Sequence, residues 1–177
     1  MMKLSVFLLL LLLETCAAST YENVALRGTA TQSDRYDSPF GAAYNAIDGN
    51  RDSRFSAGSC THTNEDSNPW WRVDLLDKYI ISSVTVTNRG DCCAERINGA
   101  QVHIGNSLEG HGAPNTVVGT ISVIPSGQSF TLTFTPVEGR YVTVFLPGAK
   151  RTLTLCEVEV YGYRASETPS ETKKPAN

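Results

Sequence analysis

The chain has few of the features that mark enzymes, membrane proteins or nucleic-acid-binding proteins. It contains neither the Gly-x-Ser-x-Gly pattern of serine hydrolases nor the His-Glu-x-x-His pattern of zinc proteases. Its 15 basic and 18 acidic residues leave a formal net charge of −3, so no nucleic-acid partner is expected. The apolar run Val6–Leu13 is far shorter than the roughly 20 residues that a membrane-spanning helix needs. These absences favour a binding protein that is not an enzyme.

The first residues have the features of a secretory signal peptide. Lys3 precedes the apolar run, and small residues follow it around Ala17 and Ala18. We therefore expect residues 1–19 to be removed and the mature protein to be secreted to the extracellular space. The cysteines that remain are Cys60, Cys92, Cys93 and Cys156, and an even number in an oxidising compartment favours disulfides.

From Trp70 onward, short segments alternate apolar residues with Thr, Ser or charged residues, which is the period of a half-buried β-strand. The segments are WWRVDL, YIISSVTVT, AQVHIG, TVVGTISV, SFTLTF, RYVTVFL and TLCEVEVYGY. Turn-forming stretches such as PSG, TPVEG and LPGAK separate them at spacings typical of antiparallel connections. The pattern predicts an all-β fold, a jelly-roll β-sandwich of seven or eight strands.

Residues 20–163 are expected to form this one domain, stapled by disulfides. Residues 21–69 are rich in Asn, Ser, Asp and Gly, and we predict that they form loops laid over one end of the sandwich. Residues 164–177 end in ASETPSETKKPAN, which lacks apolar periodicity, and are predicted to be a disordered tail.

The stretch NRGDCCAER, residues 88–96, sets two adjacent cysteines between two arginines. Adjacent Cα atoms lie about 3.8 Å apart across a trans peptide, below the usual disulfide range of about 4.4 to 6.8 Å, so a Cys92–Cys93 bond would be strained. The alternative is that each bridges separately to Cys60 or Cys156, and spacing alone does not choose between the two. A zinc site using these cysteines and His62 lacks the usual two-residue gap.

A vicinal disulfide would present a rigid apolar plate beside the N–H donors of Arg89 and Arg96, with the imidazole of His62 upstream. Donors next to such a plate suit a sugar, whose hydroxyl oxygens surround a C–H face. His103, in a strand-like segment, and His111, in a Gly-rich loop, have no predicted role.

The spacing of His62, 26 residues, Arg89-Gly90-Asp91, four residues and Arg96 resembles the signature of the F-type lectin (fucolectin) family. The resemblance extends over nearly the whole mature domain. It is carried by ENVALRG, NAIDGNRDS, GSCTHT, NPWWRVDL, TNRGDCCAERI, GRYVTV and LCEVEV, which look like eel-type fucolectins.

The resemblance implies that His62, Arg89 and Arg96 bind α-L-fucose and that a Cys92–Cys93 disulfide packs against the sugar ring. It implies the pairing Cys60–Cys156 for the other two cysteines, and an orienting role for Asp91. The loops from Tyr36 to Phe40 and from Phe55 to Ala57 are the expected niche for the methyl group of fucose.

The resemblance also implies a structural calcium ion, because related lectins carry one at matching positions. The segment NAIDGN offers oxygen-bearing side chains around a glycine turn, which by itself is typical of an Asx-rich turn. A Cys60–Cys156 bridge would bring further oxygens to it, of the kind that calcium prefers. The expected ligands are Asn45, Asp48, Asn50, Ser59, the carbonyl of Cys156, and Glu157.

The sequence therefore predicts a secreted lectin that recognises terminal fucose on glycoproteins, glycolipids or microbial surfaces, in innate immune recognition or agglutination. A homo-oligomer is expected because a single sugar site binds weakly, and similar lectins form trimers. The sequence also allows two alternatives. One is an integrin ligand that uses Arg89-Gly90-Asp91, and the other is a membrane-binding module of the discoidin type, whose galactose-binding-domain-like sandwich has the same general architecture.

Overall fold

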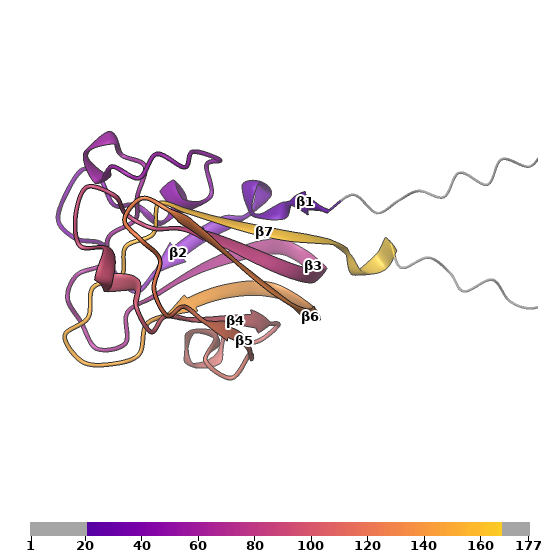
Figure 1. Ribbon diagram of the computed structural model, residues 1–177. Helices are drawn as coiled ribbons and strands as arrows, with labels where there is room; N and C mark the ends of the chain where they lie inside the picture. The colour runs from indigo at the N-terminus through magenta and orange to yellow at the C-terminus, as the bar shows by residue number, and fades with distance from the viewer. Residues whose placement is uncertain (1–20, 168–177) are drawn as a thin grey trace, which may run out of the picture.

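A computed structural model describes residues 21–167, which form a β-sandwich with its loops gathered at one end (Figure 1). The predicted signal peptide and residues 168–177 of the predicted tail lie outside the described residues. The strands are β1 (Glu22–Asn23), β2 (Thr29–Gln32), β3 (Trp70–Thr87), β4 (Gln101–Gly105), β5 (Thr116–Thr120), β6 (Ser129–Phe145) and β7 (Glu157–Arg164). Short 3₁₀ helices connect them: η1 (Val24–Arg27), η2 (Ala43–Ala46), η3 (Phe55–Ala57), η4 (Ala94–Ile97), η5 (Glu109–Gly112) and η6 (Ala165–Glu167).

Two long strands build both layers of the sandwich. The first part of β3, residues 70–74, pairs with β2 and with residues 141–145 of β6, which in turn pair with β4, and β4 with β5. The second part of β3, residues 79–87, pairs with β7 and with residues 129–139 of β6, and β1 extends β7. All these pairings are antiparallel, so the predicted all-β sandwich is confirmed.

The core lies between the layers and follows the period of two seen in the sequence. Along the start of β3, Trp71, Val73 and Leu75 are buried, whereas the residues between them face outward. Val84 and Val86 of β3 continue the apolar layer in the second part of the strand. Further members of the same core come from the other strands: Val102, Ile104, Val142, Val144, Val158 and Val160.

The predicted boundaries of several strands and loops were wrong. The segment TPVEG is not a turn, because β6 runs through it, and residues 29–32, predicted as loop, form β2 and pair with β3. The sheet also extends one residue past the predicted domain boundary, to Arg164, and η6 follows it. Within residues 21–167, no helix is long and apolar enough to cross a lipid bilayer.

Candidate functional site

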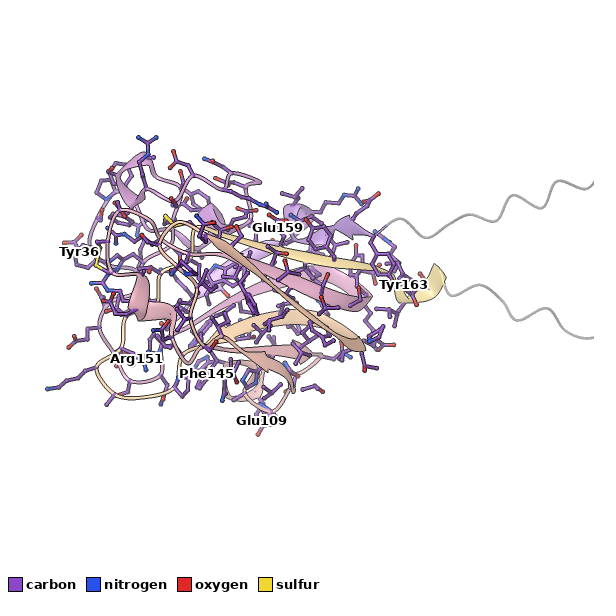
Figure 2. The ribbon with its side chains drawn as sticks, in the orientation of Figure 1. Tyr36, Glu109, Phe145, Arg151, Glu159 and Tyr163 are labelled. Atoms are coloured by element: carbon purple, nitrogen blue, oxygen red, sulfur yellow. A yellow bond between two sulfur atoms is a disulfide. The ribbon has the colours of Figure 1, made fainter. Side chains whose placement is uncertain are left out.

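A pocket of about 430 Å³ lies among the loops and brings together the residues predicted to bind sugar. Figure 2 shows Tyr36 of its wall at the loop end of the molecule, far from Tyr163 near the opposite end. The pocket is lined by Tyr36, Phe55, His62, Glu65, Arg89, Cys92, Arg96 and Thr152. His62, Arg89, Arg96 and Cys92 were predicted from the sequence, and Cys93 is not among the lining residues although it is bonded to Cys92.

His62 is held with one ring nitrogen available to the pocket. Its Nδ1 lies 2.7 Å from the carbonyl oxygen of Thr63 and must donate to it, which leaves Nε2 as an acceptor. Arg96 Nη1 donates to this Nε2 over 3.1 Å. Burial lowers the pKa of His62 below its ordinary value, the bond to Thr63 opposes this, and the charges of Arg96 and Arg89 lower it further. The imidazole is therefore neutral at pH 7.

Arg89 is fixed by its contacts with Asp91 and Phe55. Its Nε donates to Asp91 Oδ1 over 2.6 Å, and its guanidinium lies 4.6 Å from the centroid of the Phe55 ring. The second oxygen of Asp91 accepts the backbone N–H of Phe55 over 3.2 Å. Asp91 therefore orients Arg89, as the resemblance implied, and the Arg89 bond keeps the pKa of Asp91 below its ordinary value.

Gly90 lets this loop lie directly against the neighbouring one. Its N–H donates to the carbonyl of Ser53 over 2.8 Å, and a Cβ atom built on it would lie 2.3 Å from Ser53 Oγ. A side chain at this position would force Ser53 to shift and would crowd the backbone of Gly127. The glycine of the Arg-Gly-Asp sequence thus serves loop packing.

Both disulfides implied by the resemblance are present, Cys92–Cys93 and Cys60–Cys156. Cys93 has a φ of 59° and immediately precedes η4, the 3₁₀ helix that carries Arg96. The vicinal pair therefore joins the Arg89 loop to the Arg96 helix. Cys60 and Cys156 are fully buried and join the loop before His62 to the start of β7.

Sequence reasoning missed Gln32, which holds the pocket wall from behind. Its amide nitrogen lies within hydrogen-bond distance of the carbonyl oxygens of Asp34, Gly41 and His62, at 2.6, 3.2 and 3.2 Å. The His62 carbonyl also accepts the N–H of Tyr36, whose ring lies 4.6 Å from the imidazole. No motif marks a lone Gln at the end of a short strand, and Glu65 and Thr152 likewise carry no signal in the sequence.

Several of the residues predicted to bind calcium lie close together, next to the Cys60–Cys156 bridge. Asn50 Nδ2 donates to Ser59 Oγ over 3.2 Å, and Asn45 Nδ2 donates to the Cys60 carbonyl over 3.1 Å. Glu157 is fully buried; its Oε1 accepts the N–H of Gly49 over 3.1 Å, and its Oε2 has no hydrogen-bond partner within residues 21–167.

The environment of Glu157 is unfavourable for a lone carboxylate. Burial raises its pKa to about 7, the N–H of Gly49 opposes the rise, and the carboxylates of Asp48 and Glu159 add to it. No group of three or more His, Cys, Asp or Glu side chains suited to a metal occurs in the described part of the chain. The predicted set has only two carboxylates, Asp48 and Glu157, and its other members would supply amide, hydroxyl and carbonyl oxygens.

Comparison with known proteins agrees with this fold. A family model described as a NedA-like galactose-binding domain matches residues 45–144. Fucolectin-4 of Anguilla japonica is 57% identical over 143 residues, which cover 78% of this chain and 79% of the relative. The crystal structure of a serum F-lectin (fucolectin) from the striped bass, Morone saxatilis, has a TM-score of 0.81 and 68% identity, and the match covers 82% of this chain. The chain spans half the length of the striped bass lectin.

A fucose-binding module of Streptococcus pneumoniae is similar at 32% identity and a TM-score of 0.67, over 80% of this chain and 95% of the module. These relatives are named as fucolectins or for fucose binding, which agrees with the prediction of a carbohydrate-binding protein that is not an enzyme. The chain belongs to the fucolectin, or F-type lectin, family.

Proposed function

We propose that this protein is a secreted lectin that binds terminal α-L-fucose of glycans in the pocket formed by His62, Arg89, Arg96 and the Cys92–Cys93 disulfide. The observation that carries the proposal is the convergence of an acceptor nitrogen, two guanidinium groups and a disulfide sulfur on one pocket. The names of the relatives supply the sugar.

The chemistry of the pocket matches a neutral sugar with several adjacent hydroxyl groups. His62 Nε2 accepts a hydrogen bond, and a sugar hydroxyl can donate to it in place of Arg96. The freed N–H groups of Arg96 and those of Arg89 donate to the lone pairs of neighbouring oxygens. The vicinal disulfide offers a polarisable surface to the C–H face of the ring, and the rings of Tyr36 and Phe55 supply apolar contact for the methyl group.

Calorimetric titration of the oxidised, calcium-loaded protein with L-fucose tests the proposal, with D-galactose as the control sugar. We expect saturable binding of L-fucose and none of D-galactose at the same concentrations. A dissociation constant near 1 mM corresponds to about 4 kcal/mol, so titration to tens of millimolar is sufficient. Absence of heat with L-fucose at those concentrations would contradict the proposal.

The affinity for fucose should fall in acid because only neutral His62 can accept a hydroxyl hydrogen bond. Its pKa lies below 6.5, so affinity should be constant above that pH and fall as the pH passes through the lowered pKa. The lowered pKa of His62 also affects the free energy of unfolding. The contribution of His62 is fully present above pH 6.5. It is lost as the pH falls through the lowered pKa, because the unfolded chain binds a proton at this imidazole more readily than the folded chain does. An NMR titration of the imidazole should show that saturating fucose lowers the pKa further; a rise would contradict the assigned role.

We propose that a structural calcium ion is bound by Asn45, Asp48, Asn50, Ser59, the carbonyl of Cys156, and Glu157. Two observations support the fit. The buried Oε2 atom of Glu157 lacks a hydrogen-bond donor within residues 21–167, and the carboxylate of Asp48 raises the Glu157 pKa. A cation between the two carboxylates would give Oε2 a partner and offset the repulsion between the two negative charges. Oxygen ligands of these kinds are those that Ca²⁺ prefers. The ion would hold the loop of residues 45–50 against the Cys60–Cys156 bridge.

Calcium is expected to raise the melting temperature of the oxidised protein. A site loaded at 100 times its dissociation constant adds about 2.7 kcal/mol, or roughly 5 to 10 °C for a domain of this size. Glu157→Gln removes one carboxylate and should abolish the increase, whereas Glu138→Gln, an exposed carboxylate on β6, should retain it. Equal increases in the two variants would contradict the proposed ligand set.

The integrin and membrane alternatives fit the geometry less well. Arg89 of the Arg-Gly-Asp sequence is 9% exposed and its guanidinium is bound to Asp91, so its side chain does not extend freely into solvent. Tyr36 and Phe40 are exposed aromatic residues near the pocket, but their rings pack against His62 and Phe55, respectively, so they are not free to insert into a membrane.

We propose that the protein recognises fucosylated glycoproteins, glycolipids or microbial surfaces as a homo-oligomer, in immune recognition or agglutination. Several weak sites acting together bind far more tightly than one.

A further inference from the structure

A second pocket, of about 400 Å³, shares no lining residue with the proposed fucose pocket. It lies where β3 begins and β6 ends, between the loop of residues 66–68 and the η5 loop. In Figure 2, Phe145 of this pocket is labelled near Glu109 of η5, away from Tyr36. Asp66 follows His62 by four residues, so their Cα atoms lie no more than about 14 Å apart.

One side of this pocket, the aromatic wall, consists of Trp70, His111 and Phe145. The Trp70 and His111 rings are stacked, with centroids 4.7 Å apart and an angle of 17° between their planes. The guanidinium of Arg72 lies 5.0 Å from the Trp70 ring centroid and fixes the indole from its own strand. These contacts hold the indole in place before any ligand arrives.

The other side of the pocket is polar, and one of its residues has an unusual backbone conformation. Asp66, Ser67 and Asn68 contribute a carboxylate, a hydroxyl and an amide. Asn68 Oδ1 accepts the N–H of Gly148 over 2.8 Å, and the Asn68 N–H donates to the Gly148 carbonyl over the same distance. Asn68 and His111, on opposite sides of the pocket, both have positive φ, of 55° and 60°, a strained conformation that the surrounding contacts must maintain.

We propose that this pocket is a second carbohydrate site, which binds one neutral pyranose residue independently of the fucose pocket. The exposed imidazole of His111, stacked on Trp70, suits the C–H face of a pyranose, and a carboxylate, an amide and hydroxyls suit its ring of hydroxyl groups. Asp66 disfavours an anionic ligand at this position. The volume falls within the range of about 300 to 1,000 Å³ that small-molecule sites occupy. Such a site would make a single chain bivalent for glycans.

The site can be tested in the Arg96→Ala variant, in which the fucose pocket is disabled, so that its result does not depend on the proposed fucose function. ¹H–¹⁵N NMR spectra that include the Trp70 indole would be recorded during titration with the methyl glycosides of D-galactose, D-mannose and N-acetyl-D-glucosamine, and with choline as a cation. We expect at least one glycoside to shift the Trp70 indole and the Asp66–Asn68 amides saturably. Shifts with choline alone, or no saturable shift up to about 50 mM of any glycoside, would overturn the proposal.

Two further variants separate binding from folding. Trp70→Ala should weaken the responding glycoside at least tenfold while leaving the dissociation constant for L-fucose in the otherwise native chain unchanged within about twofold. If Trp70→Ala does not fold, Asn68→Gly provides the same test, because glycine adopts the positive φ without strain; the change removes the amide and its bond to the Gly148 N–H, while the backbone bond to the Gly148 carbonyl remains. Full retention of glycoside affinity in a folded variant of either kind would overturn the assignment.

Discussion

Replacing Arg89 with alanine is expected to abolish measurable binding of L-fucose. Arg89 is largely buried, and its guanidinium is already oriented by Asp91 and the Phe55 ring, so little further ordering is needed when sugar binds. In the proposed function Arg89 would donate two charge-assisted hydrogen bonds to the sugar, worth about 1.5 kcal/mol each, and the loss of about 3 kcal/mol corresponds to more than 100-fold in affinity. Calorimetric titration against the unmodified protein measures the change.

Arg140→Ala is the matched control for Arg89→Ala. Arg140 forms a two-point ion pair with Asp74, with distances of 2.7 and 2.8 Å, at the bend shared by β3 and β6 and not among the pocket residues. Its loss should leave fucose affinity unchanged within about twofold. Arg89→Lys keeps the charge but not the planar fork, and should lose most of the affinity. If Arg89→Ala bound fucose within about fivefold of the unmodified protein, the role assigned to Arg89 would be wrong.

The strands were predictable wherever burial alternates along the chain, and their boundaries were not. WWRVDL and YIISSVTVT were expected as two strands, but they form the single strand β3 with an irregularity between Asp74 and Tyr79. TPVEG looked like a turn because it contains Pro and Gly. In β6 the pairing passes from Thr133↔Ser83 to Val137↔Ile81, so the intervening residues, including Pro136, form a bulge that tolerates a residue without an N–H group.

The pocket proposed to bind sugar was predictable because its main residues match the spacing of a family signature that the sequence resembles. His62, Arg89 and Arg96 could be named from the sequence, and the structure brings them to one pocket. Gln32 could not, because its importance arises from three backbone carbonyls that meet only after β2 pairs with β3. His111 was given no role for the same reason: its contact with Trp70 joins residues 41 positions apart, and no local pattern encodes it.

Removal of the two disulfides is expected to affect different properties: loss of Cys60–Cys156 should lower the stability of the fold, and loss of Cys92–Cys93 should lower the affinity for fucose. Cys60–Cys156 joins residues 96 positions apart, so it strongly restricts the unfolded chain. Replacing both cysteines with alanine should cost about 4 kcal/mol of unfolding free energy, or roughly 8 to 16 °C in melting temperature. The same bridge joins Ser59 and Glu157 of the proposed calcium site, so this variant should also lose most of the increase in melting temperature that calcium produces.

Cys92–Cys93 closes no loop beyond its own peptide unit, so its removal leaves the entropy of the unfolded chain almost unchanged. We expect Cys92→Ser with Cys93→Ser to change the melting temperature by less than about 3 °C, within the effect of an ordinary partly exposed substitution. Its affinity for fucose should nevertheless fall about tenfold or more. Cys92 lines the pocket, and Cys93, held at positive φ, sets the start of the helix that carries Arg96.

Thermal unfolding and fucose titration of the two double variants therefore form a crossed test. The Cys60/Cys156 variant, measured below its melting temperature, should retain more of its fucose affinity than the Cys92/Cys93 variant, because its two cysteines are buried and do not line the pocket. A Cys92/Cys93 variant that is as unstable as the other would show that the vicinal pair is structural. One that binds fucose with full affinity would remove the disulfide from the sugar site and leave His62, Arg89 and Arg96 as its polar contacts.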